Sequence, residues 1–490
     1  MDDPLLLAHR QRSLVYAISG PSPISIRDQM LRGVMVVHRL IEAREIGADR
    51  PLVVVGAGAA GATAAMEAVR QGIPTVLADK TSGPFTLQSA ATSRELHPTQ
   101  YDWPAIHYDS ATLQYNRQPL PLNFYPDRAD MLSGAWTQEL GAAQRNAPVP
   151  FDIHYDIADF KFFLLSRSLG GLPTSIGVML QPTTGPQLSL QAGAVIQAFG
   201  IGSENCCCHG PNGVPYYEGQ PFWGPDKFSS LQPSQHRVLI SGSGDGALQD
   251  FLRIVTGGKR AIDILQSVES TGNLSNRMLL EIMSVEDEAH RGRSWAHDHN
   301  GALRQRHQHH YFENLEITHR NVVNRALSHP KIRNILHNIL VNAPPIDIVY
   351  REPFITSYYG LNRFLTLLLA EYSLHHAPSP RQILYPGCTI AHITAAGSSH
   401  ACMRPASAGR HRANGTYNSY GMLATHTCFG QDHQVTFNRA PSQQPMSLPT
   451  SAPPKTGIYN VIIIRHGLLP PQPPPPVFTR SNHLLPYGQT

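Results

Sequence analysis

Residues 51–79 combine a short apolar run, three closely spaced glycines and an alanine-rich stretch. The run Leu52–Val55 has no polar break, as expected of a parallel strand that is buried on both faces. A second apolar run, Thr75–Ala78, follows the alanine-rich stretch. The segment therefore predicts a strand, a tight turn, a helix over residues 59–70 and a second strand, which together begin an α/β fold with a parallel sheet.

The glycines and the acid of this segment fit the binding of a dinucleotide. Gly56 permits the tight turn, Gly58 lets the backbone approach a pyrophosphate, and Gly61 lets the helix pack closely on the strand. The N-terminus of the helix offers free N–H groups and a favourable dipole to the phosphates. Asp79 stands at the tip of the second strand, where a carboxylate can accept hydrogen bonds from ribose hydroxyls.

The run from Val53 to Gly61 resembles the N-terminal FAD fingerprint of the large FAD/NAD(P)-binding flavoprotein superfamily. The resemblance implies FAD on this turn, with Asp79 in the place of the usual acidic ribose ligand, where Glu is commoner, and Lys80 near the adenosine. In such proteins the stretch that begins here at Arg94 often carries an Arg near the FAD phosphates. The FAD contacts that the resemblance implies are Gly56, Gly58, Ala60, Gly61, Asp79, Lys80 and Arg94.

A second strand-turn-helix pattern begins at Arg237, and its first glycine, Gly242, lies 186 positions after Gly56. This turn resembles that of the thioredoxin-reductase-like NAD(P)H domain. The resemblance implies an NAD(P)H domain nested in the FAD domain, with a nicotinamide dinucleotide over the turn. The residues implied at its pyrophosphate are Gly242, Gly244, Asp245 and Ala247. A weaker match is the segment Ala194–Gly200. It resembles the strand ending in Ala-Thr-Gly that precedes the second domain in these enzymes, with Phe199 in the place of Thr.

Two departures from the family pattern leave the second nucleotide open. The expected next strand, Ala261–Leu265, has no cluster of arginines at its tip for an NADP 2′-phosphate, because Lys259 and Arg260 lie before it. NADH and NADPH therefore both remain open. A Gly-Asp motif, with which such flavoproteins usually hold the ribityl chain near the C-terminus, is also missing, and Thr394–Gly397 is a poor match for it.

The chain is predicted to divide into five parts. They are an N-terminal helical segment, an FAD-binding Rossmann-like domain, an NAD(P)-binding-like unit with a helical segment, a return to the FAD domain with the substrate region, and a Pro-rich tail. Their expected ranges are residues 1–50, 51–235, 236–345, 346–467 and 468–490. The tail is expected to be extended polyproline II, as its composition indicates.

Periodicity predicts several further elements. An amphipathic helix is expected over residues 24–45, long loops and short helices over 81–150, and mostly helix over 260–345. Strands are expected at Ser175–Leu180, Ala194–Phe199 and Ile346–Tyr350, and a helix through Leu361–Leu369. The last apolar run, Asn460–Ile464, is expected to return to the FAD-domain sheet. That return would put Arg465 or His466 near the edge where ligands bind.

Composition excludes several classes of protein. Hydrophobic residues make up 41% and charged residues 15% of the chain, which argues against a disordered protein. The formal net charge of +4 is scattered, so no groove that follows a nucleic-acid backbone is expected. The N-terminus does not resemble a signal peptide, and no apolar run is long enough to cross a membrane. A cytoplasmic location is the default expectation.

Two clusters of reactive residue types stand apart from the glycine turns. Cys206, Cys207 and Cys208 are adjacent and lack the Cys-x-x-Cys redox spacing, so a loop of small thiols is the plainer interpretation and a redox role the sharper one. Nine histidines lie between His290 and His337, in spacings that match no known metal-ligand set. No metal site is predicted. Tyr101 and Trp103 can line a flavin pocket or anchor a loop, and the anchor is favoured.

These observations favour an oxidoreductase in which NAD(P)H reduces FAD and the flavin passes electrons to oxygen or a small organic substrate. If oxygen is the acceptor, a monooxygenase is favoured, because the nested layout resembles that group. One alternative is an amine or amino-acid oxidase or dehydrogenase that uses FAD with a degenerate second site. Another is a non-catalytic dinucleotide sensor or interaction protein. A small-molecule substrate is expected as partner, while homo-oligomerisation and a protein partner for the tail stay open. No catalytic side chain is predicted, because flavin hydride transfer does not require a protein acid or base.

Overall fold

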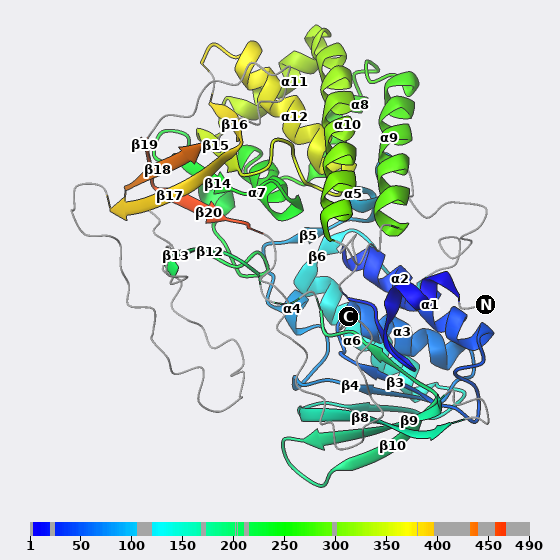
Figure 1. Cartoon of the computed structure of the whole chain (residues 1–490). Coiled ribbons are helices and arrows are strands. Elements are labelled where there is room, and N and C mark those ends of the chain that lie inside the picture. The colour runs from blue at the N-terminus through cyan, green and yellow to red at the C-terminus, as the bar shows by residue number, and fades with distance from the viewer. Residues whose placement is uncertain are drawn as a thin grey trace. The chain divides into compact units, whose positions relative to one another are not determined.

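The computed structural model describes residues 3–19, 25–104, 120–167, 173–200, 202, 204–209, 215–295, 301–379, 381–395, 432–439 and 456–466. Within these ranges the side chains of residues 4, 164, 166–167, 173–174, 215–216, 290–295, 301–310, 395 and 439 are left aside. The chain forms two compact units. The first contains Met1–Pro98 and Ile106–Gly202, and the second contains Thr99–Ala105 and Ser203–Leu469. The boundary after Gly202 lies ahead of the one expected at residue 235. Figure 1 labels the elements of both units.

The first unit is built on a sheet with the strand order β1-β2-β11-β3-β4-β7, in which β2 to β7 pair in parallel. Its elements are α1 (Pro4–His9), β1 (Arg10–Arg12), β2 (Val15–Ala17), α2 (Ile26–Glu42), β3 (Leu52–Val55), α3 (Ala59–Arg70), β4 (Thr75–Ala78), α4 (Thr86–Ser89), β5 (Glu95–Leu96), β6 (Asp127–Arg128), α6 (Ala129–Arg145), β7 (Phe151–His154), β8 (Ile157–Arg167), β9 (Pro173–Pro182), β10 (Leu188–Ala192) and β11 (Ala194–Gln197).

Alternate residues of the central strands cover the two faces of this sheet. Val53 and Val55 of β3 pack with Phe162 and Val178 of the antiparallel sheet β8-β9-β10. The helices α2 and α3 lie on the opposite side of β3 and β4 (Figure 1). A Cβ added at Gly33 of α2 would lie 3.0 Å from the Ala60 carbonyl oxygen, so this glycine lets the two helices approach closely.

The second unit is built on a parallel sheet with the strand order β16-β15-β14-β20. Its elements are α5 (Pro98–Asp102), β12 (Cys207–His209), β13 (Pro215–Glu218), the 3-10 helix η2 (Phe228–Ser230), β14 (Val238–Ser241), α7 (Asp245–Val255), α8 (Ala261–Glu269), α9 (Asn276–Trp295), α10 (Gly301–Leu327), α11 (Pro330–Leu340), β15 (Ile346–Tyr350), α12 (Gly360–His375), β16 (Gln382–Pro386), β17 (Cys388–Ala395), β18 (His433–Arg439), β19 (Thr456–Tyr459) and β20 (Val461–Ile464).

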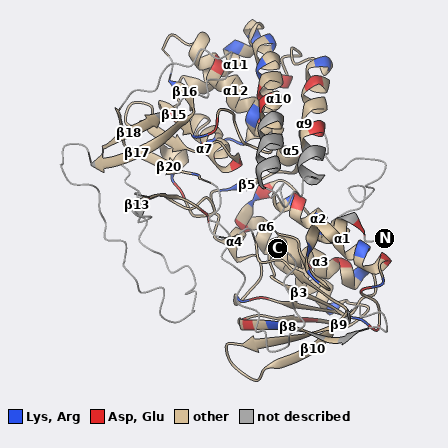
Figure 2. Ribbon diagram, in the orientation of Figure 1, with Lys and Arg blue, Asp and Glu red and all other residues tan. Residues whose placement is uncertain are grey.

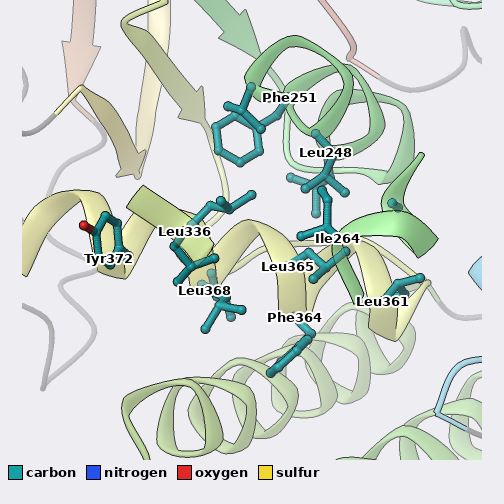
Figure 3. Close-up of a cluster of buried hydrophobic side chains, with 14 of the residues drawn as sticks. Leu248, Phe251, Ile264, Leu336, Leu361, Phe364, Leu365, Leu368 and Tyr372 are labelled. Atoms are coloured by element: carbon teal, nitrogen blue, oxygen red, sulfur yellow. The ribbon is translucent and has the colours of Figure 1, made fainter. Parts of the chain in front are cut away.

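One face of this second sheet supports a large helical core, and the other supports a second sheet. Val238 and Ile240 of β14 belong to the core that α7, α8, α11 and α12 complete, whereas Leu239 faces the antiparallel sheet β17-β18-β19. Figure 3 shows residues of α12 against those of α7, α8 and α11. The labelled core residues are Leu248, Phe251, Ile264, Leu336, Leu361, Phe364, Leu365, Leu368 and Tyr372.

Both units follow one topological plan. In each unit a first strand (β3 or β14) leads through a glycine turn into a helix, and a parallel strand (β4 or β15) pairs with one side of that first strand. An antiparallel three-stranded sheet comes later in the chain, and the strand after it (β11 or β20) pairs with the other side of the first strand. The order β11-β3-β4-β7 therefore corresponds to β20-β14-β15-β16. The hydrogen bonds after the last strands also correspond, since the Ala198 and Arg465 amides each donate over 2.7 Å to the carbonyl oxygens of Val55 and Ser241.

Many sequence expectations are confirmed, among them the helices α2, α3 and α12, the strands β4, β9, β11 and β15, and the helical character of 260–345. Three are corrected. Ala261–Leu265 is helical within α8, whose apolar residues enter the core. Residues 81–150 include the 17-residue helix α6. The strand Val461–Ile464 pairs with β14 and does not return to the first sheet, because it closes the second unit as β11 closes the first.

Charged residues of both signs occur along the described parts of α9 and α10, whereas α11 carries only Lys331 and Arg333 (Figure 2). This agrees with the low net charge of the chain. No helix in the described part of the chain is long and apolar enough to cross a membrane. The Pro-rich segment 468–490 lies outside the described residues.

Candidate functional site

The first glycine turn connects β3 to α3 at the carboxyl edge of the first sheet. Gly56 has a φ of +114°, a conformation that a residue with a Cβ rarely adopts. A Cβ there would also lie 2.2 Å from the Ala198 carbonyl oxygen, so the strand β11 leaves no room for one. A Cβ at Gly61 would lie 1.8 Å from the Gly56 carbonyl oxygen. These two glycines are therefore required by contacts within the protein.

Gly58 differs from its two neighbours. It precedes α3 with φ −73° and ψ 177°, an extended conformation that any residue adopts. A Cβ added there meets no atom within 4 Å. Neither backbone conformation nor packing therefore explains a glycine at this position. No side chain caps the first turn of α3, so the N–H groups of that turn, next to the open position at Gly58, are available for hydrogen bonds. A pyrophosphate that accepts these hydrogen bonds fits both observations.

Asp79 lies beside this turn, at the tip of β4. Its Oδ2 accepts a hydrogen bond from the Ala57 amide, in the middle of the glycine turn. Its Oδ1 accepts from the amide and hydroxyl of Thr81, over 2.8 and 2.6 Å. The carboxylate is thus held in a fixed orientation between the turn and the strand tip. Each oxygen retains acceptor capacity, which suits the ribose ligand that the resemblance implies.

The other residues expected in the first site have mixed surroundings. Ala60 lies in the first turn of α3, and Lys80 follows Asp79 as an exposed side chain. Arg94 is 2% exposed, and its carbonyl oxygen accepts a hydrogen bond from the Ala129 amide over 2.8 Å. The Arg94 side chain is thus buried within the first unit, and its contact with FAD phosphates stays a prediction.

The second glycine turn repeats the backbone geometry of the first. Gly242 has a φ of +133°, and a Cβ there would lie 2.1 Å from the Arg465 carbonyl oxygen. Gly244 precedes α7 in an extended conformation, with no side-chain cap, and a Cβ there meets nothing within 4 Å. Ala247 is fully buried at the position that Gly61 holds in the first turn. The second turn therefore offers the same open backbone at its helix N-terminus.

The side chains around the second turn are engaged within the unit. Asp245 accepts hydrogen bonds from the Ser357 hydroxyl, from the Tyr358 and Tyr359 amides over 2.8 and 3.1 Å, and from Asn362 over 3.1 Å. Burial of the Asp245 carboxyl raises its pKa above the usual value, although the hydrogen bonds from these donors act to lower it. Two of them are amides at the N-terminus of α12. The carboxylate expected near a pyrophosphate thus joins α7 to α12.

The strand tip of the second unit lacks the acid of the first. The Gly56 amide donates to Ala78 over 2.7 Å, and the Gly242 amide donates to Val349 over 2.9 Å, so Tyr350 stands where Asp79 stands in the first unit. Tyr350 is 2% exposed, and burial raises its pKa well above the usual value. The residue that would accept ribose hydroxyls is therefore replaced by a core tyrosine.

Several other sequence candidates have structural roles. Trp103 is 6% exposed and stacks on Phe364 at 5.1 Å between ring centroids, and Tyr101 meets Tyr359 edge-on at 4.9 Å. Both aromatic residues thus anchor α5 within the second unit, as favoured from the sequence. Arg465 bonds Asp250 over 2.9 Å, which ties the end of β20 to α7.

Sequence reasoning did not find the residue that closes the first turn from the far side, and it placed Arg465, which closes the second turn, at the edge of the wrong sheet. Ala198 and Arg465 lie against Gly56 and Gly242, and both follow a strand that is distant in the chain. For Ala198, the available signal was the resemblance of Ala194–Gly200 to the strand that precedes the second domain in the flavoproteins. For the second, the apolar run of β20 was recognised, but its sheet was not. The side chains of the histidines between 290 and 310 lie outside the described residues, and the described side chains contain no group of His, Cys, Asp or Glu able to hold a metal.

No family model and no curated protein matches the sequence. The solved structures found as similar include two thioredoxin reductases. The one from Lactococcus lactis has 9% identity and a TM-score of 0.32, over 85% of this chain and 77% of that one. The one from T. acidophilum has 11% identity and a TM-score of 0.34, over 86% of this chain and 78% of that one. A thioredoxin reductase from Giardia duodenalis is similar at 10% identity and a TM-score of 0.30, over 85% of this chain and 76% of that one. These scores are too low to define the architecture, which rests on the strand pairing described above.

Proposed function

We propose that this chain is a flavin-dependent oxidoreductase whose first unit holds the FAD pyrophosphate at the turn Gly56–Gly61. The observation that carries the proposal is Gly58. The other two glycines of the turn are explained by neighbouring protein atoms, whereas the open space at Gly58 adjoins uncapped N–H groups of α3. The resemblance of this turn to an FAD fingerprint supports FAD as the occupant, and Asp79, whose carboxylate accepts from the Ala57 amide of the turn, would accept its ribose hydroxyls.

FAD, when bound, supplies two-electron chemistry that no amino-acid side chain provides. The protein's part is to position the cofactor with the helix N-terminus of α3 and the carboxylate of Asp79. The second turn, with the same open position at Gly244, is the candidate site for NAD(P)H as electron donor. Oxygen or a small organic molecule would then accept the electrons, and a monooxygenase is the favoured form of the reaction with oxygen.

The test begins with the visible spectrum of freshly purified protein and mass analysis of the compound released by heat. We expect a flavin spectrum and the mass of FAD. Gly58→Val should abolish FAD retention without unfolding the protein, because the new side chain enters the space proposed for the pyrophosphate. Gly244→Val is the matched control, since the same change in the second turn should leave FAD bound. Colourless protein that takes up no added FAD would remove the proposal.

A second candidate is an amine or amino-acid oxidase or dehydrogenase that uses FAD while its second turn binds no nucleotide. Two observations favour it: Tyr350 replaces the strand-tip acid, and Asp245 is engaged by α12. Anaerobic titration with NADH and NADPH separates the two candidates. Bleaching of the flavin supports the NAD(P)H-linked enzyme, and Gly244→Val should then slow it. Bleaching by a primary amine or amino acid, with none by either nicotinamide, supports the second candidate.

A further inference from the structure

The segment that joins β13 to β14 places an aromatic ring against the second glycine turn. A Cβ added at Gly246, in the first turn of α7, would lie 3.3 Å from Cδ2 and 3.6 Å from Cε2 of Phe222. The Phe222 ring therefore lies beside a residue that is two positions along the chain from the open position at Gly244. The first unit has Ala60 at the corresponding position. The Phe222 ring thus explains why this position is glycine in the second unit.

The backbone and the ring of Phe222 are both held by the rest of the second unit. The Phe222 amide donates a hydrogen bond to the Glu204 carboxylate, and Arg465 donates one to the Gln220 carbonyl oxygen. The Arg465 guanidinium also lies over the Phe222 ring, 5.8 Å from its centroid, a distance that allows a cation–π contact. Because Arg465 also bonds Asp250 over 2.9 Å, the Phe222 ring is tied to α7.

The next part of the same segment is tied to α7 by a buried ion pair. The Asp226 carboxylate accepts two hydrogen bonds from the Arg253 guanidinium, over 2.8 and 2.9 Å. The Asp226 side chain is 1% exposed, so this two-point contact is shielded from water and fixes the course of the chain. Trp223 lies between Phe222 and Asp226 and is therefore held on both sides. A residue on so fixed a backbone loses little conformational freedom when it meets a ligand.

Trp223 is the residue of this segment that we expect to meet a ligand. Its ring meets that of Phe222 edge-on, with centroids 5.2 Å apart and an interplanar angle of 87°. Both rings are half-buried, whereas Trp103 and Trp136 are 6% and 0% exposed. An indole that packing leaves partly exposed keeps a surface on which another ring can stack. Phe222 and Trp223 together form an aromatic wall beside the first turn of α7, which no side chain caps.

We propose that Trp223 stacks against a planar ring of the nicotinamide dinucleotide whose pyrophosphate lies at Gly244, with Phe222 as its support. The inference rests on the NAD(P)H site proposed above and deepens it. A dinucleotide has one planar ring on each side of its pyrophosphate, so a dinucleotide at the first turn of α7 carries a ring past the residues beside that turn. Stacking requires only a π-face, which adenine and nicotinamide both have. Either ring therefore fits the aromatic wall, and fragments of the dinucleotide distinguish them.

The experiment measures the dissociation constants of NAD⁺, NADP⁺ and ADP-ribose for the full-length protein with its FAD, by isothermal titration calorimetry. None of these ligands can reduce the flavin. We expect Trp223→Ala to raise the dissociation constant about 5- to 150-fold, as the loss of one stacked ring does. A loss that includes ADP-ribose assigns adenine to Trp223. A loss for NAD⁺ or NADP⁺ but not for ADP-ribose assigns the nicotinamide.

Two further variants separate stacking from packing. Trp223→Phe keeps an aromatic face and should bind within about threefold of the wild type. Trp223→Leu is the matched control, because leucine is apolar but has no π-face, and it should bind as weakly as the alanine variant. The FAD content of all variants should equal that of the wild type, since the FAD site is proposed in the other unit, and circular dichroism confirms that they are folded.

The outcomes separate this inference from the function on which it rests. It is overturned if Trp223→Ala binds all three ligands as the wild type does, or if Trp223→Phe loses as much affinity as Trp223→Ala. Wild-type protein that retains FAD and binds none of the three would remove both this inference and the NAD(P)H site, but not the FAD site. Protein that lacks FAD, yet binds a dinucleotide in a way that depends on Trp223, would support the aromatic wall and remove the flavin function.

Discussion

Two glycines three positions apart in the first turn have different physical causes. Gly61 is required by the protein itself, since the Gly56 carbonyl oxygen occupies the place of its Cβ. Gly58 is required by nothing within the described protein, and its backbone suits any residue. The sequence motif alone assigns all the glycines to one ligand. The structure separates the glycine that shapes the turn from the one that leaves room beside it.

This difference gives a prediction for stability. Gly61→Ala should lower the free energy of unfolding by about 2 kcal/mol or more, because a Cβ 1.8 Å from a carbonyl oxygen forces helix and strand apart. Gly58→Ala should change it by less than about 0.5 kcal/mol, since the added methyl contacts nothing. Urea unfolding of the wild type and both variants, each freed of bound nucleotide, measures the contrast. Equal losses would mean that the turn is not packed as described.

A buried ion pair in the second unit gives another prediction at this scale. Glu286 accepts hydrogen bonds from Arg363 and, over 2.9 Å, from His319, and all three are almost fully buried. Glu286→Gln leaves the guanidinium without its counter-charge, which should cost about 3–5 kcal/mol of unfolding free energy. Glu281→Gln, which removes the partner of Arg325 on the surface, should cause no measurable change. Chemical denaturation of both variants tests the comparison.

The buried imidazole of His319 predicts a dependence on pH. Burial lowers the pKa of His319 below its usual value near 6.5, although Glu286 opposes this, with Arg363 and Glu316 also nearby. Between pH 6.5 and the lowered pKa, His319 therefore binds a proton in the unfolded chain but not in the folded protein. The free energy of unfolding consequently decreases as the pH falls through this window. Below the lowered pKa, His319 is protonated in both states and no longer contributes to the pH dependence. His319→Gln should reduce the slope of stability against pH by up to about 1.4 kcal/mol per pH unit in this window. An unchanged slope would contradict the assignment.

At the scale of elements, one carboxylate joins the helices that follow β14 and β15. Asp245 begins α7 and accepts hydrogen bonds from the amides that precede α12. Asp245→Ala should cost at least about 2 kcal/mol, because several donors lose their acceptor together. Asp245→Asn should recover part of the loss through its remaining carbonyl oxygen. Thermal unfolding measures both, and a loss below 0.5 kcal/mol for the alanine variant would show that the carboxylate does not hold α12.

Sequence patterns predicted correctly those helices and strands that depend on neighbouring residues in the chain. The strand, turn and helix of residues 52–70 follow from hydrophobic runs and glycine, and they are found at the predicted positions. Ala261–Leu265 was expected as a strand because a short apolar run is ambiguous, and burial against the helical core decides for helix. The strands β1 and β2 were missed because each is only three residues long. The strand β2 depends on pairing with β11, and β1 depends on pairing with β2.

The partner of a strand is less accessible to sequence reasoning than the strand itself. The run at Val461–Ile464 was recognised as a strand, yet its sheet was mistaken. The two glycine turns present the same kind of edge, so an apolar strand carries no information about which one it joins. Asp245 illustrates the same limit, since its position in the motif predicted a ligand contact while the residues from Ser357 to Asn362, more than 110 positions away, determine its bonds.

At the scale of the whole molecule, one plan is used twice with little shared sequence. Each unit has its own apolar core, one around Val53, Val178 and Val195 and the other around the helices on β14. The first core contains only residues of the first unit, and the second contains only residues of the second. Cores built in this way unfold as separate cooperative bodies unless their interface couples them strongly.

We therefore expect two thermal transitions, each sensitive to substitutions in one unit alone. Gly61→Ala should lower the transition of the first unit by about 4–8 °C for a loss of about 2 kcal/mol, and Glu286→Gln should lower only the other. Scanning calorimetry at several heating rates, with and without added FAD, measures both. FAD should raise the transition that Gly61→Ala lowers, because ligand binding stabilises only the body that holds it. A single transition lowered by both substitutions would show that the two units unfold together. FAD stabilisation of the transition that Glu286→Gln lowers would place the cofactor in the second unit.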